Sequence, residues 1–339
     1  MIPVKGEQAF LGRSIIQGIE TALSQANVEV ELIVEDVPCD QIKAIESFQR
    51  LVKDGVVAIV GPTCLETFTA VAGLSELSEV VVITPTLTDK IASEGEYVFR
   101  TMPSMAELSK KLGQIIYEEG YHRLGILYPA SIKYQEFILE VSRVYKQRGG
   151  KIISQQSFNQ ESLRLKNSII RIKAEVPDAI LLISDNQHLV PRALELLSSE
   201  LKYVEVFGVD GAMGLNFLPA AYAEGMRLIL PSTGDGDFLR KYELLYNTTP
   251  DFYATTAYDA MIALTTAFDL NYLLGEEIRD FLYKNEFKGA NGYFVFDENG
   301  DTAGTFRTYE IRQGKLCPIF YADTLAQDNT CISFLKKVE

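Results

Sequence analysis

Hydrophobic positions along this chain follow two alternating periods. Ile15, Ile19 and Ala22 recur at the three- to four-residue spacing of a helix with one buried face, and residues 28–34 then alternate as a strand. Strand-length apolar runs and helix-length amphipathic stretches continue to follow one another along most of the chain. The further predicted strands are 56–60, 80–84, 123–128, 151–154, 179–184, 204–208 and 226–230, and the clearest further helices are 40–53, 66–77 and 253–270.

Strands that alternate with helices predict parallel sheets covered by helices on both faces. The chain has more strand–helix units than one compact open sheet accommodates. A length of 339 residues also allows two domains, each with its own core. We therefore predict an α/β protein with two doubly wound, Rossmann-like lobes.

Two places are candidates for crossings between these lobes. At residues 118–122 a glycine ends one helix before a new strand, and residues 249–251 precede the strong helix at 253–270. Beyond that helix the pattern becomes rich in hairpins. The predicted lobes are therefore 1–120 with 252–304 and 121–251 with 305–321, followed by a tail at 322–339. A chain that leaves one lobe, builds another and returns suits closure over a ligand.

Composition limits the classes of function that this chain can have. The chain has 32 Lys and Arg against 46 Asp and Glu, a formal net charge of −14 that disfavours binding to nucleic acid. No apolar run approaches the roughly 18 residues that a membrane-spanning helix needs. Only two histidines, His122 and His188, are available for catalysis or for a histidine-rich metal site.

Motifs of enzymes and cofactor sites are missing from the sequence. It contains no GxSxG, HExxH, CxxC or GxxxxGK[ST] pattern. Residues 297–301 look like the start of a calcium loop, but the glycine is misplaced and Thr308 stands where the loop needs Glu, so a hairpin turn is the better interpretation. We expect no enzymatic activity, no cofactor and no metal.

Several motifs, weak singly, occur together in one order. They are residues 6–22 (GEQAFLGRSIIQGIETA), 55–63 (GVVAIVGPT), 83–88 (ITPTLT), 97–103 (YVFRTMP), 258–260 (YDA) and 296–301 (FDENGD). In this order they resemble the type I periplasmic binding proteins, in particular the leucine/isoleucine/valine-binding branch that serves branched-chain amino acid ABC transporters. The resemblance extends from Met1 to about Tyr321, and the first strand of the family is represented only by residues 2–4.

The resemblance implies the type I periplasmic-binding fold, with a ligand cleft between two lobes joined by three crossovers. It also implies a periplasmic or extracellular location, although no signal peptide follows Met1. Two interpretations of that start are a cytosolic protein and a mature or trimmed chain. The resemblance favours the second, with the natural N-terminus upstream.

The four cysteines fall into two groups under this resemblance. Cys39 and Cys64 match the pair that forms a disulfide in the branched-chain amino acid binders. Cys317 and Cys331 have no such precedent, and a bridge between them is inferred from their number alone.

Loops after two predicted strands of the first lobe are candidate binding elements. Residues 63–66 (Thr63, Cys64, Leu65 and Glu66) follow one strand, and Thr86 and Thr88 follow the next. Ligands of open α/β sheets bind at the carboxyl ends of strands, where helix N-termini favour anions. Ordinary helix capping by threonine is the alternative. The resemblance assigns Thr88 to a ligand carboxylate.

Leu65 and Glu66 depart from the family pattern. At the position of Leu65 the family usually has a serine, whose hydroxyl donates a hydrogen bond to the ligand carboxylate. Leucine cannot donate a hydrogen bond. Glu66 adds a negative charge unless its side chain turns to solvent. Simple branched-chain amino acids are therefore expected to bind poorly.

Candidate residues of the second lobe are acidic or aromatic. Asp210 matches the family residue that holds the ligand ammonium, and Asp185 follows another strand, where the family often has an aromatic residue. An Asp-Gly turn is the alternative for Asp210. Tyr134 matches a cleft tyrosine, with core packing as its alternative.

We therefore predict a solute-binding protein that captures a small polar ligand, an amino acid or an amine-bearing relative, by lobe closure. Its predicted partner is the membrane permease of an ABC importer. A receptor signalling module is the alternative partner, in which case the chain is the sensor domain of a membrane receptor. An enzyme would need a nucleophile, base or metal in the cleft. A repressor core would need a basic helix-turn-helix before residue 6, which is absent from the printed sequence.

Overall fold

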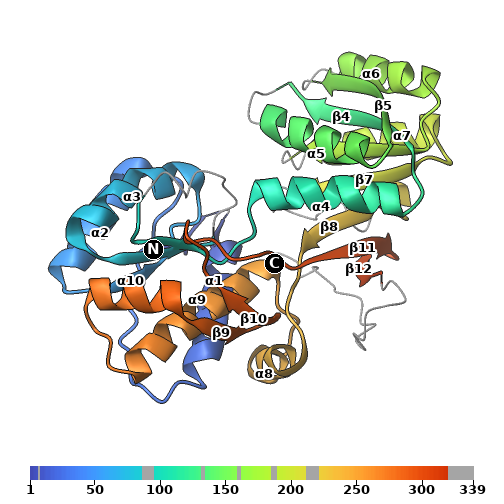
Figure 1. Ribbon diagram of the computed structural model, residues 1–339. Coiled ribbons are helices and arrows are strands. Elements are labelled where there is room, and N and C mark those ends of the chain that lie inside the picture. Colours follow the sequence, from blue (N-terminus) through green and yellow to red (C-terminus); the bar gives the residue numbers. More distant parts are fainter. Residues whose placement is uncertain are drawn as a thin grey trace. The chain divides into compact units, whose positions relative to one another are not determined.

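The computed structural model describes residues 1–6, 8–85, 95–130, 134–158, 162–184, 189–210 and 221–319. The chain divides into two compact units (Figure 1). Unit 1 consists of Met1–Met105 with Pro231–Thr305, and unit 2 consists of Ala106–Leu230 with the segment from Phe306 onward. The chain therefore crosses between the units three times.

Unit 1 contains a parallel sheet with helices around it. The sheet has the order β1 (Ala58–Val60), β2 (Val81–Thr84), β3 (Val98–Arg100). Every residue of β2 is buried, as expected for an inner parallel strand. Isolated bridges add Ile2 beside Asp36, and Asp301 beside Arg100.

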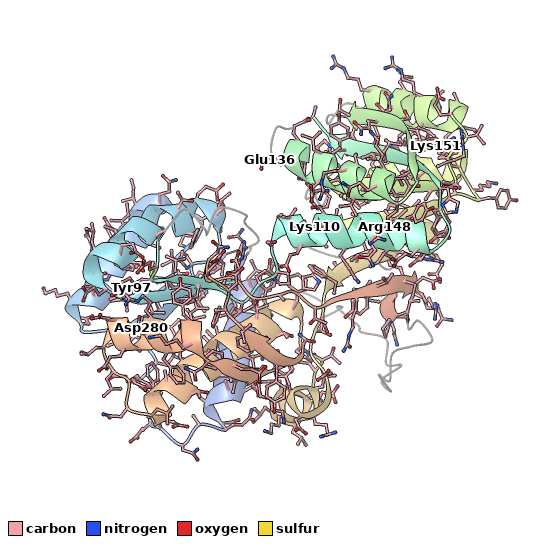
Figure 2. All side chains as sticks on the ribbon, viewed as in Figure 1. Tyr97, Lys110, Glu136, Arg148, Lys151 and Asp280 are labelled. Atoms are coloured by element: carbon pink, nitrogen blue, oxygen red, sulfur yellow. A yellow bond between two sulfur atoms is a disulfide. The ribbon has the colours of Figure 1, made fainter. Side chains whose placement is uncertain are left out.

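Six helices and one hairpin complete the described part of unit 1. They are α1 (Ala9–Leu23), α2 (Gln41–Lys53), α3 (Leu65–Ser78), α8 (Gly236–Tyr246), α9 (Phe252–Asp269), α10 (Gly275–Lys284) and the hairpin of β9 (Glu286–Gly289) and β10 (Gly292–Val295). α2 begins after Asp40, whose carboxylate accepts hydrogen bonds from the amides of Ile42 and Lys43. α10 is tied to the start of β3 because the Arg279 guanidinium donates to the Tyr97 hydroxyl at 3.1 Å. Within α10, Arg279 also pairs with Asp280, which Figure 2 labels together with Tyr97.

The close contact of α1 with α9 depends on a glycine. A Cβ atom at Gly18 would collide with the backbone carbonyl of Ala254 in α9, so only glycine lets the two helices approach this far. α9 is apolar around most of its circumference and is buried along most of its length. α9 packs against β1 of the sheet, and α1 packs against α9.

The strand predicted over residues 28–34 is wrong. These residues belong to no strand, and Ile2–Asp36 is the isolated bridge next to them. Alternating apolar residues form a strand only where a neighbouring strand takes up their backbone groups, and the chain beside them is paired at Ile2 alone. The predicted turn at 297–301 is confirmed, since Asp297 accepts bonds from the amides of Asn299 and Asp301.

Unit 2 is built on a seven-stranded sheet. Its order is β12 (Lys315–Pro318), β11 (Phe306–Arg312), β8 (Arg227–Pro231), β7 (Glu205–Asp210), β6 (Ala179–Ser184), β4 (Arg123–Pro129), β5 (Lys151–Phe158). The strands from β8 to β5 are parallel, and β11 and β12 form an antiparallel hairpin. These strands follow the predicted apolar runs closely.

Helices lie on both faces of this sheet (Figure 1). They are α4 (Met105–Glu118), α5 (Gln135–Gln147), α6 (Ser162–Ala174) and α7 (Leu189–Glu200), with a short 3₁₀ helix at Ala221–Ala223. The core under α6 and α7 is apolar: Ile169 and Leu194 pack with Leu127, Ile180 and Leu182 of the strands. The predicted α/β class with doubly wound sheets is confirmed.

The boundaries of the two units differ from the predicted ones. The first crossing lies at 105/106 instead of 120/121, because α4 packs on α5: a Cβ at Gly113 would come within 2.8 Å of the Val141 carbonyl. The second lies at 230/231 instead of 251/252, because α8 packs on α1 through Tyr242, whose hydroxyl donates to Gln17 at 2.7 Å. The third lies one residue later than predicted, at 305/306. The predicted tail at 322–339 lies outside the described residues.

Candidate ligand-binding site

Within the described parts of the chain, the N-terminus of α3 has backbone amides that no other group is found to bind. β1 ends at Val60 and the chain turns through Gly61 and Pro62 into Cys64, which occupies the N-cap position without a side-chain cap. The first bond within the helix runs from the Phe68 amide to the Cys64 carbonyl at 2.9 Å. The amides of Leu65, Glu66 and Thr67 precede that bond, so they are the open donors of the helix. Together with the helix dipole they favour an anion.

Thr63 lies directly before these donors. Its hydroxyl oxygen is buried, and no hydrogen-bond partner is found for it in the part of the chain that the structure describes. A buried polar group without a partner costs about 1–3 kcal/mol. A ligand oxygen that bonded to the hydroxyl would remove this cost.

A disulfide fixes the position of the helix start. Cys64 is bonded to Cys39, with their Cα atoms 5.6 Å apart, so the segment before α2 is joined to the N-cap of α3. Gln8, just before α1, places its side-chain oxygen 3.3 Å from the Cys39 sulfur. The predicted Cys39–Cys64 disulfide is confirmed. Cys317 is also disulfide-bonded, and its predicted partner Cys331 lies outside the described residues.

Leu65 and Glu66 are both accessible in the first turn of α3. The Leu65 side chain is 38% exposed, and Glu66 is exposed to solvent. A carboxylate in the first turn of a helix is stabilised by the dipole, so Glu66 has a structural reason for its place. Leu65 adds an apolar surface next to the open amides.

The remaining candidate residues of unit 1 follow β2. Thr84 ends the strand, and its hydroxyl donates to the Pro62 carbonyl at 2.7 Å, which joins the carboxyl ends of β1 and β2. Thr86 and Thr88 lie outside the described residues. Their role in carboxylate binding stays a prediction.

In unit 2 the acidic candidates belong to the carboxyl ends of neighbouring strands. Asp210 is the last residue of β7 and is paired in parallel register with Ser184, the last residue of β6. Asp185 follows Ser184 and lies outside the described residues, as does the side chain of Asp210. Because the carboxyl ends of parallel strands share one edge of a sheet, Ser184 and Asp210 end their strands at the same edge.

Tyr134 precedes α5 at its N-cap position. The residue is only 7% exposed. Burial is what the core-packing alternative predicts, and a ligand-binding role for Tyr134 stays a prediction.

A polar cluster near the end of β3 was not predicted from the sequence. A cavity of about 50 Å³ is lined by Ser232, Thr256, Asp259 and Asn291, among others. The buried side-chain oxygens of Ser232 and Asn291 have no hydrogen-bond partner within the described ranges. Burial raises the pKa of Asp259 to about 7, partly offset by the hydrogen bond from the Ala290 amide, and Asp235 raises it further. An acid within the otherwise apolar helix pattern of 253–270 was the available signal.

The described residues contain neither a metal-binding cluster nor a membrane-spanning helix. They contain no group of three or more His, Cys, Asp or Glu side chains placed to hold a metal ion. None of their helices is long and apolar enough to span a membrane.

Comparison with known proteins assigns the family. The model of the periplasmic binding protein family matches residues 1–315, and the chain belongs to this family. A curated relative, the leucine-, isoleucine-, valine-, threonine- and alanine-binding protein of Pseudomonas aeruginosa, is 22% identical over 327 residues, which cover 91% of this chain and 87% of the relative.

Solved structures share the fold. An ABC transporter substrate-binding protein from Desulfitobacterium hafniense in complex with Leu has a TM-score of 0.79 at 18% identity, covering 91% of this chain and 95% of its own. A solute-binding protein of an ABC transporter from Rhodopseudomonas palustris BisB5, in complex with 3,4-dihydroxybenzoic acid, has a TM-score of 0.77 at 18% identity, covering 97% of this chain and 96% of its own. The predicted resemblance to the type I periplasmic binding proteins is confirmed.

Proposed function

We propose that this protein is an extracytoplasmic solute-binding protein that captures a small carboxylate-bearing ligand, an amino acid or an amine-bearing relative, for an ABC importer. The observation that carries the proposal is the buried Thr63 hydroxyl, which has no hydrogen-bond partner among the described residues and lies beside the first amides of α3. These groups are all donors, and a carboxylate is an acceptor with two oxygens. Membership of the periplasmic binding protein family and the curated amino acid-binding relative support a ligand of this kind.

The ligand amine is assigned to unit 2. Asp210, with Asp185, would supply negative charge at the carboxyl ends of β7 and β6. A ligand that contacts both units favours the closed form over the open one by its differential affinity for the two. The closed form would then be recognised by the membrane permease.

Leu65 supports a second candidate ligand, an aromatic carboxylate. Its exposed side chain lies at the open amides, in place of the hydroxyl that the amino acid binders usually have there. The related protein from Rhodopseudomonas palustris was solved with a hydroxylated benzoic acid, which has a carboxylate and no amine. The sensor domain of a membrane receptor remains the alternative use of the same ligand site. Substrate uptake by cells with and without the protein separates importer from sensor.

Calorimetric titration tests the carboxylate site. The purified protein is titrated with amino acids, benzoates and polyamines, and Thr63→Val is compared with Thr69→Val, whose hydroxyl bonds to the Leu65 carbonyl on an exposed face of α3. Loss of a hydrogen bond to a charged group, worth about 1.5–3 kcal/mol, lowers affinity roughly 10- to 100-fold. We expect this loss in Thr63→Val alone. Equal affinities of both variants for a carboxylate ligand would reject the site.

Two further variants assign the rest of the ligand. Asp210→Asn is expected to weaken binding of amine-bearing ligands and to leave benzoates unaffected. Leu65→Ser is expected to strengthen leucine binding by about one to two decades, since it restores a hydroxyl donor. Tight leucine binding to the unaltered protein would show that Leu65 does not set specificity.

A further inference from the structure

The polar cavity of unit 1 is lined by residues beside all three crossings of the chain. We call it the Asp259 cavity. Its volume of about 50 Å³ is larger than the roughly 10–15 Å³ needed for one water molecule. Thr101 and Pro103 precede the first crossing, Ser232 follows the second, and residues 302–305 precede the third. α9 and the hairpin of β9 and β10 supply most of the remaining lining.

The groups without partners in the Asp259 cavity are oxygens that can accept. Ser232 is only 2% exposed, and neither its hydroxyl nor the buried side-chain oxygen of Asn291 has a hydrogen-bond partner among the described residues. One oxygen of Asp259 accepts from the Ala290 amide at 2.6 Å, and its other oxygen accepts no bond from any described residue. A donor or a cation would satisfy all three groups.

Three threonine hydroxyls of the lining are also acceptors toward the cavity. Each already donates its proton to a backbone carbonyl: Thr101 at 2.8 Å, Thr256 at 3.3 Å and Thr302 at 3.3 Å. A hydroxyl has one proton, so these oxygens can offer a further group only their lone pairs. The lining is therefore rich in acceptors.

No positive charge in the described lining balances Asp259, because this lining contains no Lys, Arg or His. The other titratable groups close to Asp259 are Asp235, before α8, and two tyrosines, Tyr258 of α9 and Tyr293 of β10. None of these groups can carry a positive charge. A carboxylate buried without a counter-charge is costly, and this burial, with the nearby charge of Asp235, raises the pKa of Asp259 to about 7.

We propose that the Asp259 cavity binds one small monovalent metal cation, sodium or potassium, through the Asp259 carboxylate, the Ser232 hydroxyl and the Asn291 side-chain oxygen. Oxygen ligands suit hard cations, and one carboxylate neutralises a single charge. Calcium sites usually supply several carboxylates, and the described residues contain no group of three or more acidic, His or Cys side chains that could hold such an ion. The bound cation would join the unit 1 ends of the crossing segments to α9. This site shares no residue with the proposed solute site.

Melting temperatures in different chloride salts test the cation site. The purified protein is measured at pH 8 and at pH 5 in sodium, potassium or choline chloride at one ionic strength, because salt screens the self-repulsion of a chain with a net charge of −14. At pH 8, sodium or potassium is expected to raise the melting temperature by about 3 °C relative to choline, which is too large for the cavity. At pH 5 the three salts are expected to be equal, because a proton then occupies the carboxylate.

Variants connect the salt effect to the Asp259 cavity. Asp259→Asn is expected to lose the effect, whereas Asp269→Asn, at the exposed end of the same helix, should retain it. Ser232→Ala should raise the cation concentration needed for half the effect about tenfold. Its control is Thr265→Val, which removes a buried hydroxyl of α9 that bonds to the Met261 carbonyl and does not line the cavity.

A heavy analogue of the cation locates the site directly. Crystals grown at pH 8 with thallium(I) acetate are expected to show an anomalous scattering peak beside Asp259 and Ser232. Neither this measurement nor the comparison of salts needs a variant, so both remain decisive if Asp259→Asn does not fold.

Three results would overturn the proposal. Equal melting temperatures in the three salts at pH 8 would mean that the Asp259 cavity holds water alone. A sodium or potassium effect that persists in Asp259→Asn would place the cation elsewhere on the protein. Thallium peaks that all lie outside the cavity would do the same.

Discussion

The two sheets of this protein differ in how completely their strands are surrounded. β6 in unit 2 is buried at every residue and is paired on both edges, by β4 and β7. β1 in unit 1 is paired along one edge with β2, and its residues line a mostly apolar cavity of about 320 Å³. Unit 1 also has the polar cavity beyond β3. Similar parallel sheets therefore differ in where packing is saturated and where it is left open.

This difference indicates which residues contribute most to folding stability and which are available to bind a ligand. Where a side chain is surrounded on all sides, removing part of it loses van der Waals contacts in every direction. A side chain beside a cavity has fewer such contacts to lose. Three features belong to unit 1: the Thr63 hydroxyl, for which the described residues offer no partner, the cavity beside β1, and the polar cavity lined by Asp259. Among the described residues of unit 2, the buried Thr308 hydroxyl also has no hydrogen-bond partner, so open polar groups are not confined to unit 1.

The largest expected effect is loss of side-chain volume from β6. Ile180→Ala should destabilise unit 2 by up to about 5 kcal/mol, because Ile180 is fully buried in the core under α6 and α7. Ile59→Ala in β1 should destabilise unit 1 by only about 2 kcal/mol, since Ile59 already lines the cavity beside β1. Denaturant titration followed by hydrogen exchange in each unit measures both. Equal losses would mean that Ile59 is surrounded as completely as Ile180.

The next effect is a pH dependence specific to unit 1. Because the pKa of Asp259 is about 7 when folded and lower when unfolded, the folded state holds its proton over a wider pH range. Stability from this group is thus present at low pH and is lost as pH rises toward and through about 7, by an amount of the order of 4 kcal/mol. Asp259→Asn should remove this decline and be more stable than the unaltered protein at pH 8.

Melting temperatures between pH 4 and pH 8 measure the effect of Asp259. Asp269→Asn, at the exposed end of the same helix, is the matched control and should retain the decline. Parallel pH profiles of Asp259→Asn and the unaltered protein would contradict a buried acid that titrates near neutrality.

Much of the fold could be predicted from the sequence because its signals are local. β6 coincides with the predicted strand at 179–184, and α2 and α9 match their predicted helices within a residue or so. The wrong strand at 28–34 and the shifted crossings share one cause. That cause is tertiary packing, which local signals do not show. A glycine marks where a helix ends, and an apolar alternation marks a segment that could form a strand. The helices α4 and α8, however, belong to the units whose helices they pack against.

The candidate site, too, was predicted where its signals are local and was missed where they are not. Residues 63–66 were predicted at a helix start because strand, turn and helix follow one another directly in sequence, and the structure places them there. The Asp259 cavity was missed because it joins side chains from three distant segments, Ser232, Asp259 and Asn291. Nothing in the local pattern of any one segment shows the other two.

The Cys39–Cys64 disulfide should contribute the next largest effect. It closes a loop with a sequence separation of 25, for which chain entropy predicts about 3.5 kcal/mol. A Cys39→Ala, Cys64→Ala double variant should therefore destabilise unit 1 by that amount and weaken ligand binding, since the helix start with Thr63 loses its anchor. Denaturant titration and calorimetry check both effects. An unchanged midpoint would show that the loop is already ordered without the bond.

The smallest expected effect tests helix packing in unit 1 at two helical glycines. Gly18→Ala should destabilise the protein by about 1–3 kcal/mol, because the new methyl group meets the Ala254 backbone, which cannot move aside without separating α1 from α9. Gly73→Ala in α3 is the matched control: nothing lies within 4 Å of its Cβ position, so the higher helix propensity of alanine should stabilise by up to about 1 kcal/mol. Urea midpoints of the two variants should thus move in opposite directions. If Gly18→Ala stabilised the protein, α1 and α9 would have room for a methyl group between them. Packing between these two helices of unit 1 would then be looser than packing around β6 in unit 2.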